Sequence, residues 1–370
     1  MIGGLWAFVK RHRRKFVFLG SFVGGSWLLY KYIWKKIQEI RDEEDKQYLI
    51  LVRRQHHFDS NQRTCNMTVL AMVSNVREIL TKTLDTESIK EMLKSNPQNK
   101  LDLWEELKVM SVTRTLASVY GTCILSVMLR VQLNVVGGYL YLDSVHPTNG
   151  HKVESGHSAQ IPQRVQERYL SLVKQFIEQG FLDFINYLRL AVMKEIGSLP
   201  LKELMSLDQL TSVFDHIRER VECGVDKPTQ SLYPYLLTSE QVPDIAKTTV
   251  QNSEDELLEK LIAETRDILE SNDFHTVLKG SIDRGYHCIL DGVADHYKQQ
   301  SASTEHPSGI HEISIALAKL VPVINSLMYS ICGDAPNPFI QELLLMEELK
   351  QLAANVYEAF SQDPSEKPSI

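Results

Sequence analysis

Residues 10–36 constrain the fold of this chain more than any other stretch, because few environments accept them. A basic cluster, KRHRRK, leads directly into residues 16–30, which carry no charge. That uncharged run is shorter than the roughly 20 residues that a helix needs to cross a bilayer. Tyr32 and Trp34 follow, and such side chains settle at the headgroup level, while lysines extend toward water. Counted from residue 16 to residue 34, the segment is therefore long enough to span a membrane.

Three interpretations of this segment are open on the residues alone. A cleaved signal peptide has the same order of basic and apolar residues, but no small-residue cleavage site follows Tyr30. A buried core helix is the second interpretation, although no other stretch of the chain has such flanking charge. An uncleaved membrane anchor over residues 16–34, preceded by a basic segment over residues 1–15, agrees best with these observations.

The charged residues are divided unevenly between this segment and the rest. The chain contains 40 Lys/Arg and 47 Asp/Glu residues. Residues 1–41 hold nine of the basic residues and one of the acidic residues, so the remainder has a net charge of −15. An acidic body would repel nucleic acid, so we expect no nucleic-acid partner. The basic charge lies where an anionic lipid surface would meet it. Charge on the two sides of the anchor is nearly balanced, so the residues alone do not predict its orientation.

The cysteines indicate a reducing environment. There are five, an odd count with wide spacings, and no C-x-x-C pair occurs. Free thiols buried in a cytosolic body agree with this pattern better than a disulfide framework does.

Apolar residues with spacings of three and four predict that the body, residues 35–361, is built from helices. Asp85 is a plausible N-cap, and the helix from residue 100 is apolar on most faces, which is typical of a central helix. We expect Gly137-Gly138 to bend or end that helix. The fold class is therefore all-α, an elongated bundle of long helices with an N-terminal transmembrane anchor helix, followed by a disordered tail over residues 362–370. The predicted helices cover residues 39–58, 65–84, 86–94, 100–133, 162–180, 181–196, 201–223, 253–270, 274–297, 310–331 and 337–361, with loops over 146–161, 224–242 and 298–309.

Signatures of catalysis are absent from the sequence. There is no phosphate-binding glycine loop, nucleophile elbow or zinc-protease motif. His56 and His57 are neighbours, so on a helix their rings point about 100° apart and cannot face one metal ion. These observations give no sequence motif for enzyme activity and argue against a metal site at the two histidines.

Residues 53–66, RRQHHFDSNQRTCN, place many polar groups between two apolar helices. Enzyme chemistry is one interpretation of this stretch. The other, which we favour, is a buried hydrogen-bond network that fixes a helix junction.

Trp104 is the residue that we single out as a candidate for binding a partner. It lies in the first turns of its helix, between Lys100 and Lys108, with Leu107 three residues further on. A tryptophan at such a position is either part of the core or part of an exposed apolar groove. Lysines at the rim would suit the groove to an acidic amphipathic helix, and tryptophan is enriched at binding hot spots.

Several blocks of the chain carry a family resemblance. They are KRHRRK at 10–15, RRQHHFDSNQRTCNMTVL at 53–70, NKLDLWEELK at 99–108, LRVQLNVVGGYLYLD at 129–143 and FIQELLLMEELKQLAANVYEAFS at 339–361. With these blocks the chain resembles the peroxin-3 family of peroxisomal membrane biogenesis factors. Residues 144–161 and 223–252 fit less well, as variable loops do.

The resemblance implies a function that composition does not. Members of that family are anchored in the peroxisomal membrane by the N-terminus, with a helical body in the cytosol, and have neither catalytic activity nor a cofactor. They dock peroxin-19, a chaperone carrying new peroxisomal membrane proteins, through a helix that lies in an apolar groove; other peroxins are further candidate partners. The matching groove residues here are Leu93, Lys94, Lys100, Trp104, Leu107 and Lys108, and the matching membrane-targeting residues are Lys10, Arg11, Arg13, Arg14 and Lys15.

Two other hypotheses use the same anchor without the family match. One is a general tether or adaptor on another organelle surface. The other is an anchored enzyme, which would need a polar pocket with converging carboxylates or histidines.

Overall fold

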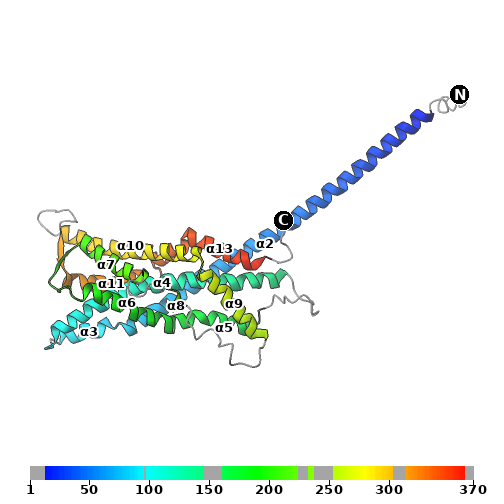
Figure 1. The fold of residues 1–370 in the computed structure, drawn as a ribbon. Helices are drawn as coiled ribbons and strands as arrows, with labels where there is room; N and C mark the ends of the chain where they lie inside the picture. The colour runs from blue at the N-terminus through cyan, green and yellow to red at the C-terminus, as the bar shows by residue number, and fades with distance from the viewer. Residues whose placement is uncertain are drawn as a thin grey trace. The chain divides into compact units, whose positions relative to one another are not determined.

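The structure is a computed structural model of the chain. It describes residues 13–95, 97–145, 161–223, 232–236, 253–302 and 313–362. The chain divides into two units, residues 1–59 and residues 60–370, and each is described by itself. Helix α2, Arg13–Thr83, contributes to both (Figure 1).

The first unit contains the predicted anchor and the helix expected after it. Arg13, Arg14 and Lys15 begin α2, whereas Lys10 and Arg11 lie outside the described residues. The helix predicted over residues 39–58 is confirmed as part of α2. Between residues 30 and 52 the apolar side chains are exposed, including Trp34 at 50% and Leu49 at 65%.

The second unit is a helical bundle around α4, Lys100–Val145. Every residue from Leu107 to Gln132 is buried, as the prediction of a central helix requires. Among the described residues α4 is the one helix with the length and apolar composition to cross a membrane, but 94% of its most apolar window is buried within the protein. Helix α4 is therefore the core of the body.

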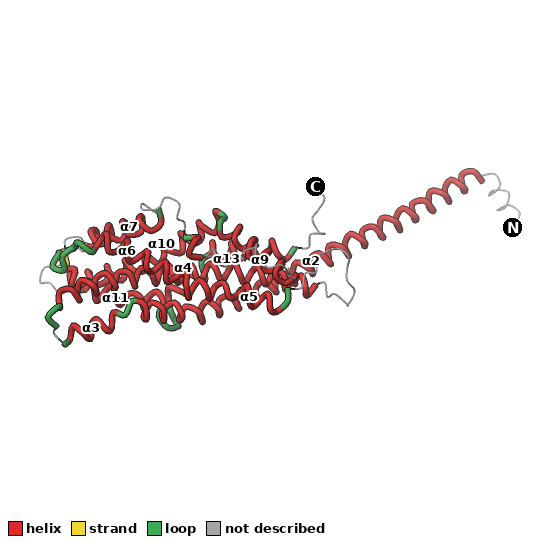
Figure 2. The backbone as a smooth tube through the Cα atoms, turned by 60° about the horizontal axis from the view of Figure 1, so that its bottom comes forward, coloured by secondary structure: helices red, strands yellow, loops and turns green. Residues whose placement is uncertain are grey.

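Other helices pack around α4 and confirm the all-α fold class. Figures 1 and 2 show α5, α6, α10, α11 and α13 running beside it, and all five contact it. Their bounds are α5 Gln163–Gln175, η1 (a π-helical turn) Phe176–Gly180, α6 Phe181–Ile196, α7 Leu207–Glu222, α8 Tyr233–Leu236, α9 Ser253–Leu269, α10 Asn272–Ala302, α11 Leu317–Cys332, α12 Pro338–Leu345 and α13 Glu347–Ser361.

The part of α2 in the body confirms a helix over residues 65–84. Val73, Val76, Leu80 and Leu84 are buried at helical spacing and form its core face, whereas Met67 is 68% exposed.

The expected break at Gly137-Gly138 is wrong, since α4 continues to Val145. These glycines serve close packing instead. A Cβ atom on Gly138 would lie 2.7 Å from Phe360 Cβ and 2.8 Å from the Phe360 carbonyl carbon in α13. The packing of two helices at this point outweighs the cost of about 1 kcal/mol for each glycine in a helix.

Helix starts agree with local capping chemistry. The Asp85 side chain accepts hydrogen bonds from the backbone N–H groups of Glu87 and Ser88, which confirms it as the N-cap of α3, Thr86–Lys94. Ser206 and Gln209 form a capping box at the start of α7. Asn337 caps α12, with a proline directly after it.

Two predicted helices begin later than expected because short strands precede them. Strands β1, Leu204–Ser206, and β2, Ser314–Ala316, pair antiparallel with Met205 opposite Ile315. Consequently α7 begins at residue 207 rather than 201, and α11 at residue 317 rather than 310.

The last predicted helix is also interrupted. Met346, with a non-helical backbone, separates α12 from α13 within the expected range 337–361. The loops expected over residues 146–161 and 224–242 fall largely outside the described residues, and the tail from residue 363 falls wholly outside them.

The polar stretch at residues 53–66 includes the expected buried network. The buried Arg130 guanidinium in α4 donates to the side-chain oxygens of Gln62 and Asn66 and to the Leu344 carbonyl oxygen. Asn134 accepts hydrogen bonds from Asn61 at 3.0 Å and from Gln62 at 2.7 Å. A hydrogen-bond network is therefore present, but the expected helix junction at residues 53–66 is wrong. Helix α2 continues through this stretch without a break, and the amide residues join α2 to α4 instead. Arg53 and Arg63 are exposed.

Candidate partner-binding groove

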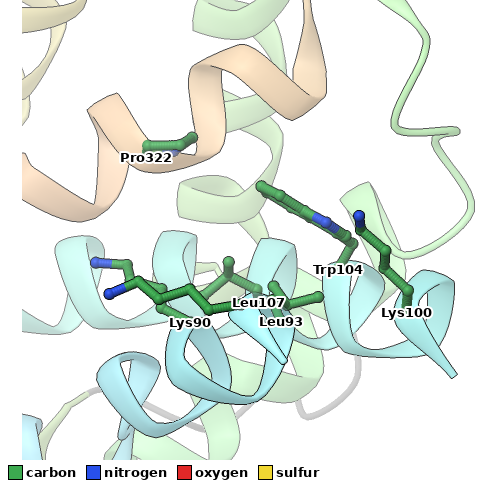
Figure 3. A pocket seen from close by; sticks show the side chains of 7 residues that line it. Lys90, Leu93, Lys100, Trp104, Leu107 and Pro322 are labelled. Atoms are coloured by element: carbon green, nitrogen blue, oxygen red, sulfur yellow. The ribbon is translucent and has the colours of Figure 1, made fainter. Parts of the chain in front are cut away.

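A groove of about 340 Å³ opens between α3, α4 and α11 (Figure 3). Helix α3 supplies one wall, the first turns of α4 supply the other, and α11 contributes Pro322. The lining residues are Lys90, Leu93, Lys94, Lys100, Trp104, Leu107 and Pro322.

The floor of the groove is apolar and continuous with the core. Leu107 is 2% exposed. Leu93 and Trp104 are half-buried and pack against the core cluster. Figure 3 shows the Trp104 ring projecting from α4 into the space in front of Pro322. Trp104 thus has one part in the core and one part in the groove. It combines the two positions that the sequence left open for it, core residue and groove residue.

The rim of the groove is positively charged. Lys94 and Lys100 are exposed, and Lys90 is half-buried with its ammonium 2.8 Å from the Glu87 carboxylate. No carboxylate is among the described residues that line the groove. An acidic ligand would therefore meet cations on both walls.

Lys108 was expected at this rim, and the structure corrects that expectation. Its side chain is completely buried. The ammonium donates to the carbonyl oxygens of Gly197 at 3.3 Å and Leu199 at 2.7 Å, and it pairs with Glu105. A buried ammonium needs such partners, so Lys108 is absent from the groove lining and instead holds the start of α4 against the segment after α6.

Two lining residues were missed by sequence reasoning. Lys90 lies one turn before Lys94 on α3, so helical spacing from Lys94 is a signal that was available. Pro322 had no such signal, because it is far from α3 and α4 in the sequence and joins the groove only through the packing of α11 on α4.

The other positions considered for chemistry do not converge on a site. No group of three or more His, Cys, Asp or Glu side chains suited to a metal ion occurs in the described part of the chain. All five cysteines are free thiols. The groove itself combines an apolar floor with a positively charged rim, an arrangement that complements apolar and acidic side chains.

Comparison with known proteins identifies relatives over almost the whole chain. The Peroxin-3 family profile matches residues 7–100 and 94–359. Peroxisomal biogenesis factor 3 of Rattus norvegicus is 42% identical over 98% of both chains, and that of Homo sapiens is 41% identical over 98% of both. Peroxisome biogenesis protein 3-1 of Arabidopsis thaliana is 26% identical over 96% of this chain and 98% of its own.

Proposed function

Because this chain belongs to the peroxin-3 family of peroxisome biogenesis factors, we propose that it docks peroxin-19, which carries new membrane proteins, through a helix of peroxin-19 in the groove at Trp104. The chain acts in peroxisome biogenesis at the peroxisomal membrane, and it is not an enzyme. In this proposal residues 16–34 anchor it, the basic residues before them target it, and the body faces the cytosol.

One observation carries the docking proposal, namely an apolar floor that lies between lysines. Leu93, Trp104 and Leu107 offer a continuous apolar surface, while Lys94 and Lys100 stand exposed at its edge. A helix with leucine or phenylalanine at i, i+3, i+4 and i+7 and acidic residues beside them complements this surface. The buried aromatic contact governs the off-rate, and the exposed lysines govern the on-rate and its salt dependence.

The test is a titration of the full chain, held in detergent micelles, against a labelled peptide of the peroxin-19 amphipathic helix. Trp104→Ala should weaken binding by about 2–4 kcal/mol, the range of a hot-spot residue. Leu190→Ala is the matched control, because Leu190 is an apolar side chain on α6 that is 59% exposed and lies outside the groove. A loss below about 0.5 kcal/mol for Trp104→Ala, well under the hot-spot range, would refute the groove assignment.

The same titration at several salt concentrations separates the lysines from the tryptophan. Lys94→Gln and Lys100→Gln should slow association and flatten its salt dependence. Lys174→Gln, a change of an exposed lysine on α5, should do neither. If the association rate and its salt dependence are the same in all three variants, the charged rim plays no part in docking.

A further inference from the structure

A second pocket, of about 480 Å³, lies apart from the groove at the end of α2. Its volume falls within the range of about 300–1,000 Å³ that is typical of small-ligand sites. The pocket combines cations with hydroxyl groups. Its lining residues are Ser74, Arg77, Glu78, Thr81 and Lys82 of α2 and Tyr329 of α11.

A buried guanidinium stands directly behind the wall of this pocket. Arg114 of α4 is 0% exposed. Its Nη2 atom lies 3.4 Å from the Thr81 hydroxyl and 3.5 Å from the Tyr329 hydroxyl, both of which line the pocket. Hydrogen bonds of this length are weak compared with the usual 2.7–3.2 Å, so the donor that points toward the pocket is poorly satisfied.

The charge of Arg114 is also poorly compensated. Its nearest carboxylate oxygen, on Glu87, lies 3.9 Å away and belongs to a side chain that is 56% exposed. The same oxygen atom is 2.8 Å from the Lys90 ammonium. A buried charge with so distant a counter-charge favours an additional anion nearby.

The two cations inside the pocket have partners that a ligand can replace. Lys82 pairs with Glu78 at 2.6 Å, with the two side chains 73% and 62% exposed. Arg77 pairs with Asp334 at 2.6 Å, with the two side chains 24% and 87% exposed. A pair as exposed as that of Lys82 contributes little stability, about 0–1 kcal/mol, and the partner of Arg77 stands in solvent. A ligand with two negative charges can exchange for these carboxylates.

We propose that this pocket binds a phosphate group, free or as a monoester. Arg77 and Lys82 provide charge-assisted hydrogen bonds, which are the strongest that phosphate oxygens receive from side chains. The Tyr329 hydroxyl accepts from Arg114 and keeps its own hydrogen to donate to the ligand. Arg114 attracts the anion from behind this wall without contacting solvent.

This proposal is independent of the docking function. The phosphate pocket and the docking groove share no lining residue. Loss of peptide docking with phosphate binding intact, or the reverse, therefore identifies which assignment fails.

The experiment uses the full chain in detergent micelles and measures the ³¹P line broadening of O-phosphoserine and of inorganic phosphate. Saturable broadening by the protein is the expected result for both probes. Acetate, added in excess, should compete poorly, since it carries one charge and fewer acceptor oxygens. Displacement of the phosphate probes by equimolar acetate, or no saturable broadening for either probe, would overturn the proposal.

Variants of the lining residues should change the phosphate affinity in opposite directions. Lys82→Gln and Tyr329→Phe should each weaken the affinity about three- to fivefold, the scale of one exposed polar interaction. Glu78→Gln removes the competing carboxylate and should strengthen the affinity by a similar factor. Lys298→Gln is the matched control, because Lys298 forms the same kind of local pair, at 2.8 Å from Asp295, outside the pocket. Weaker binding in Glu78→Gln, or an equal loss in Lys298→Gln, would contradict the assignment.

Discussion

Lysines that look equivalent in the block at residues 99–108 have different physical roles. Lys100 is exposed at the groove, whereas Lys108 is enclosed and satisfies two backbone carbonyl groups. A buried acceptor that loses its donor costs about 1–3 kcal/mol. The first of these residues should therefore affect binding and the second should affect folding.

We predict that Lys108→Ala lowers the free energy of unfolding by about 2–4 kcal/mol, because the Gly197 and Leu199 carbonyl groups lose their donor. Denaturant unfolding of the full chain in detergent measures this change. Lys100→Ala, the matched control, should stay within about 0.5 kcal/mol of wild type, as surface changes do. Equal effects in the two variants would contradict the distinction between them.

The thiols of the chain should react at very different rates. Burial raises the pKa of Cys65 to about 11 and that of Cys332 to about 12, and it also raises the pKa of Cys123. Thiolates are the reactive form, so these three should be inert at neutral pH. Cys223 is the exposed thiol.

Maleimide labelling of the native full chain should therefore begin with a fast phase of one equivalent. Cys223→Ser should remove that phase, and Cys288→Ser, a change at a half-buried thiol, should leave it intact. Mass spectrometry after digestion identifies the modified residue. Fast labelling at Cys65 would show that α2 separates transiently from the helices that it packs against in the body.

At the scale of the elements, the close contact of α4 with α13 depends on Gly138. A Cβ atom there would meet backbone atoms of Phe360, which cannot move without displacing α13. Gly138→Ala should destabilise the body by about 1–3 kcal/mol, as overpacking does, despite the better helix propensity of alanine.

Thermal or denaturant unfolding tests this prediction against a glycine whose added Cβ would contact no backbone atom. Gly280 in α10 is the matched control, since its Cβ would lie 3.2 Å from the terminal methyl carbon of Met346, which is the end of a flexible side chain. Gly280→Ala should be neutral or stabilising by up to about 1 kcal/mol. A stabilised Gly138→Ala variant would indicate that α13 does not pack against α4 at this point.

The elements that the sequence predicts well are those with long apolar periodicity. Helices such as α4 and α6 have many apolar residues at helical spacing, so local pattern and tertiary packing agree. The strands β1 and β2 are three residues each, too short for an alternating pattern to be recognised. Their pairing joins residues more than a hundred positions apart, and no local signal reports it.

At the scale of the whole molecule, the N-terminal segment separates the docking proposal from a general organelle tether. Residues 1–45 fused to a fluorescent protein should go to peroxisomes, because they contain both the basic cluster and the apolar run. Imaging beside a peroxisomal marker is the measurement. The matched control replaces the five basic residues of the cluster by glutamine, which should disperse the signal. A purely mitochondrial signal for the unaltered fusion would favour the tether.

The candidate groove could be predicted only in part from the sequence. Trp104 and Leu107 are separated by one helical turn, and the family resemblance points to the same block. The burial of Lys108 could not be predicted, because its acceptors lie 89 and 91 residues further along the chain. Contacts of that kind follow from how the helices pack, which no local spacing encodes.

Hydrogen bonds between α2 and α4 have a consequence for how α2 is held in the body. Asn61 and Gln62 donate to Asn134, and Asn66 accepts from Arg130, so a displacement of residues 60–83 along their own axis would load all of these bonds in shear. Apolar contacts alone are non-directional and would let the helix slide by one turn. Directional bonds to Asn134 and to the Arg130 guanidinium oppose that slip, so this part of α2 keeps its register on α4.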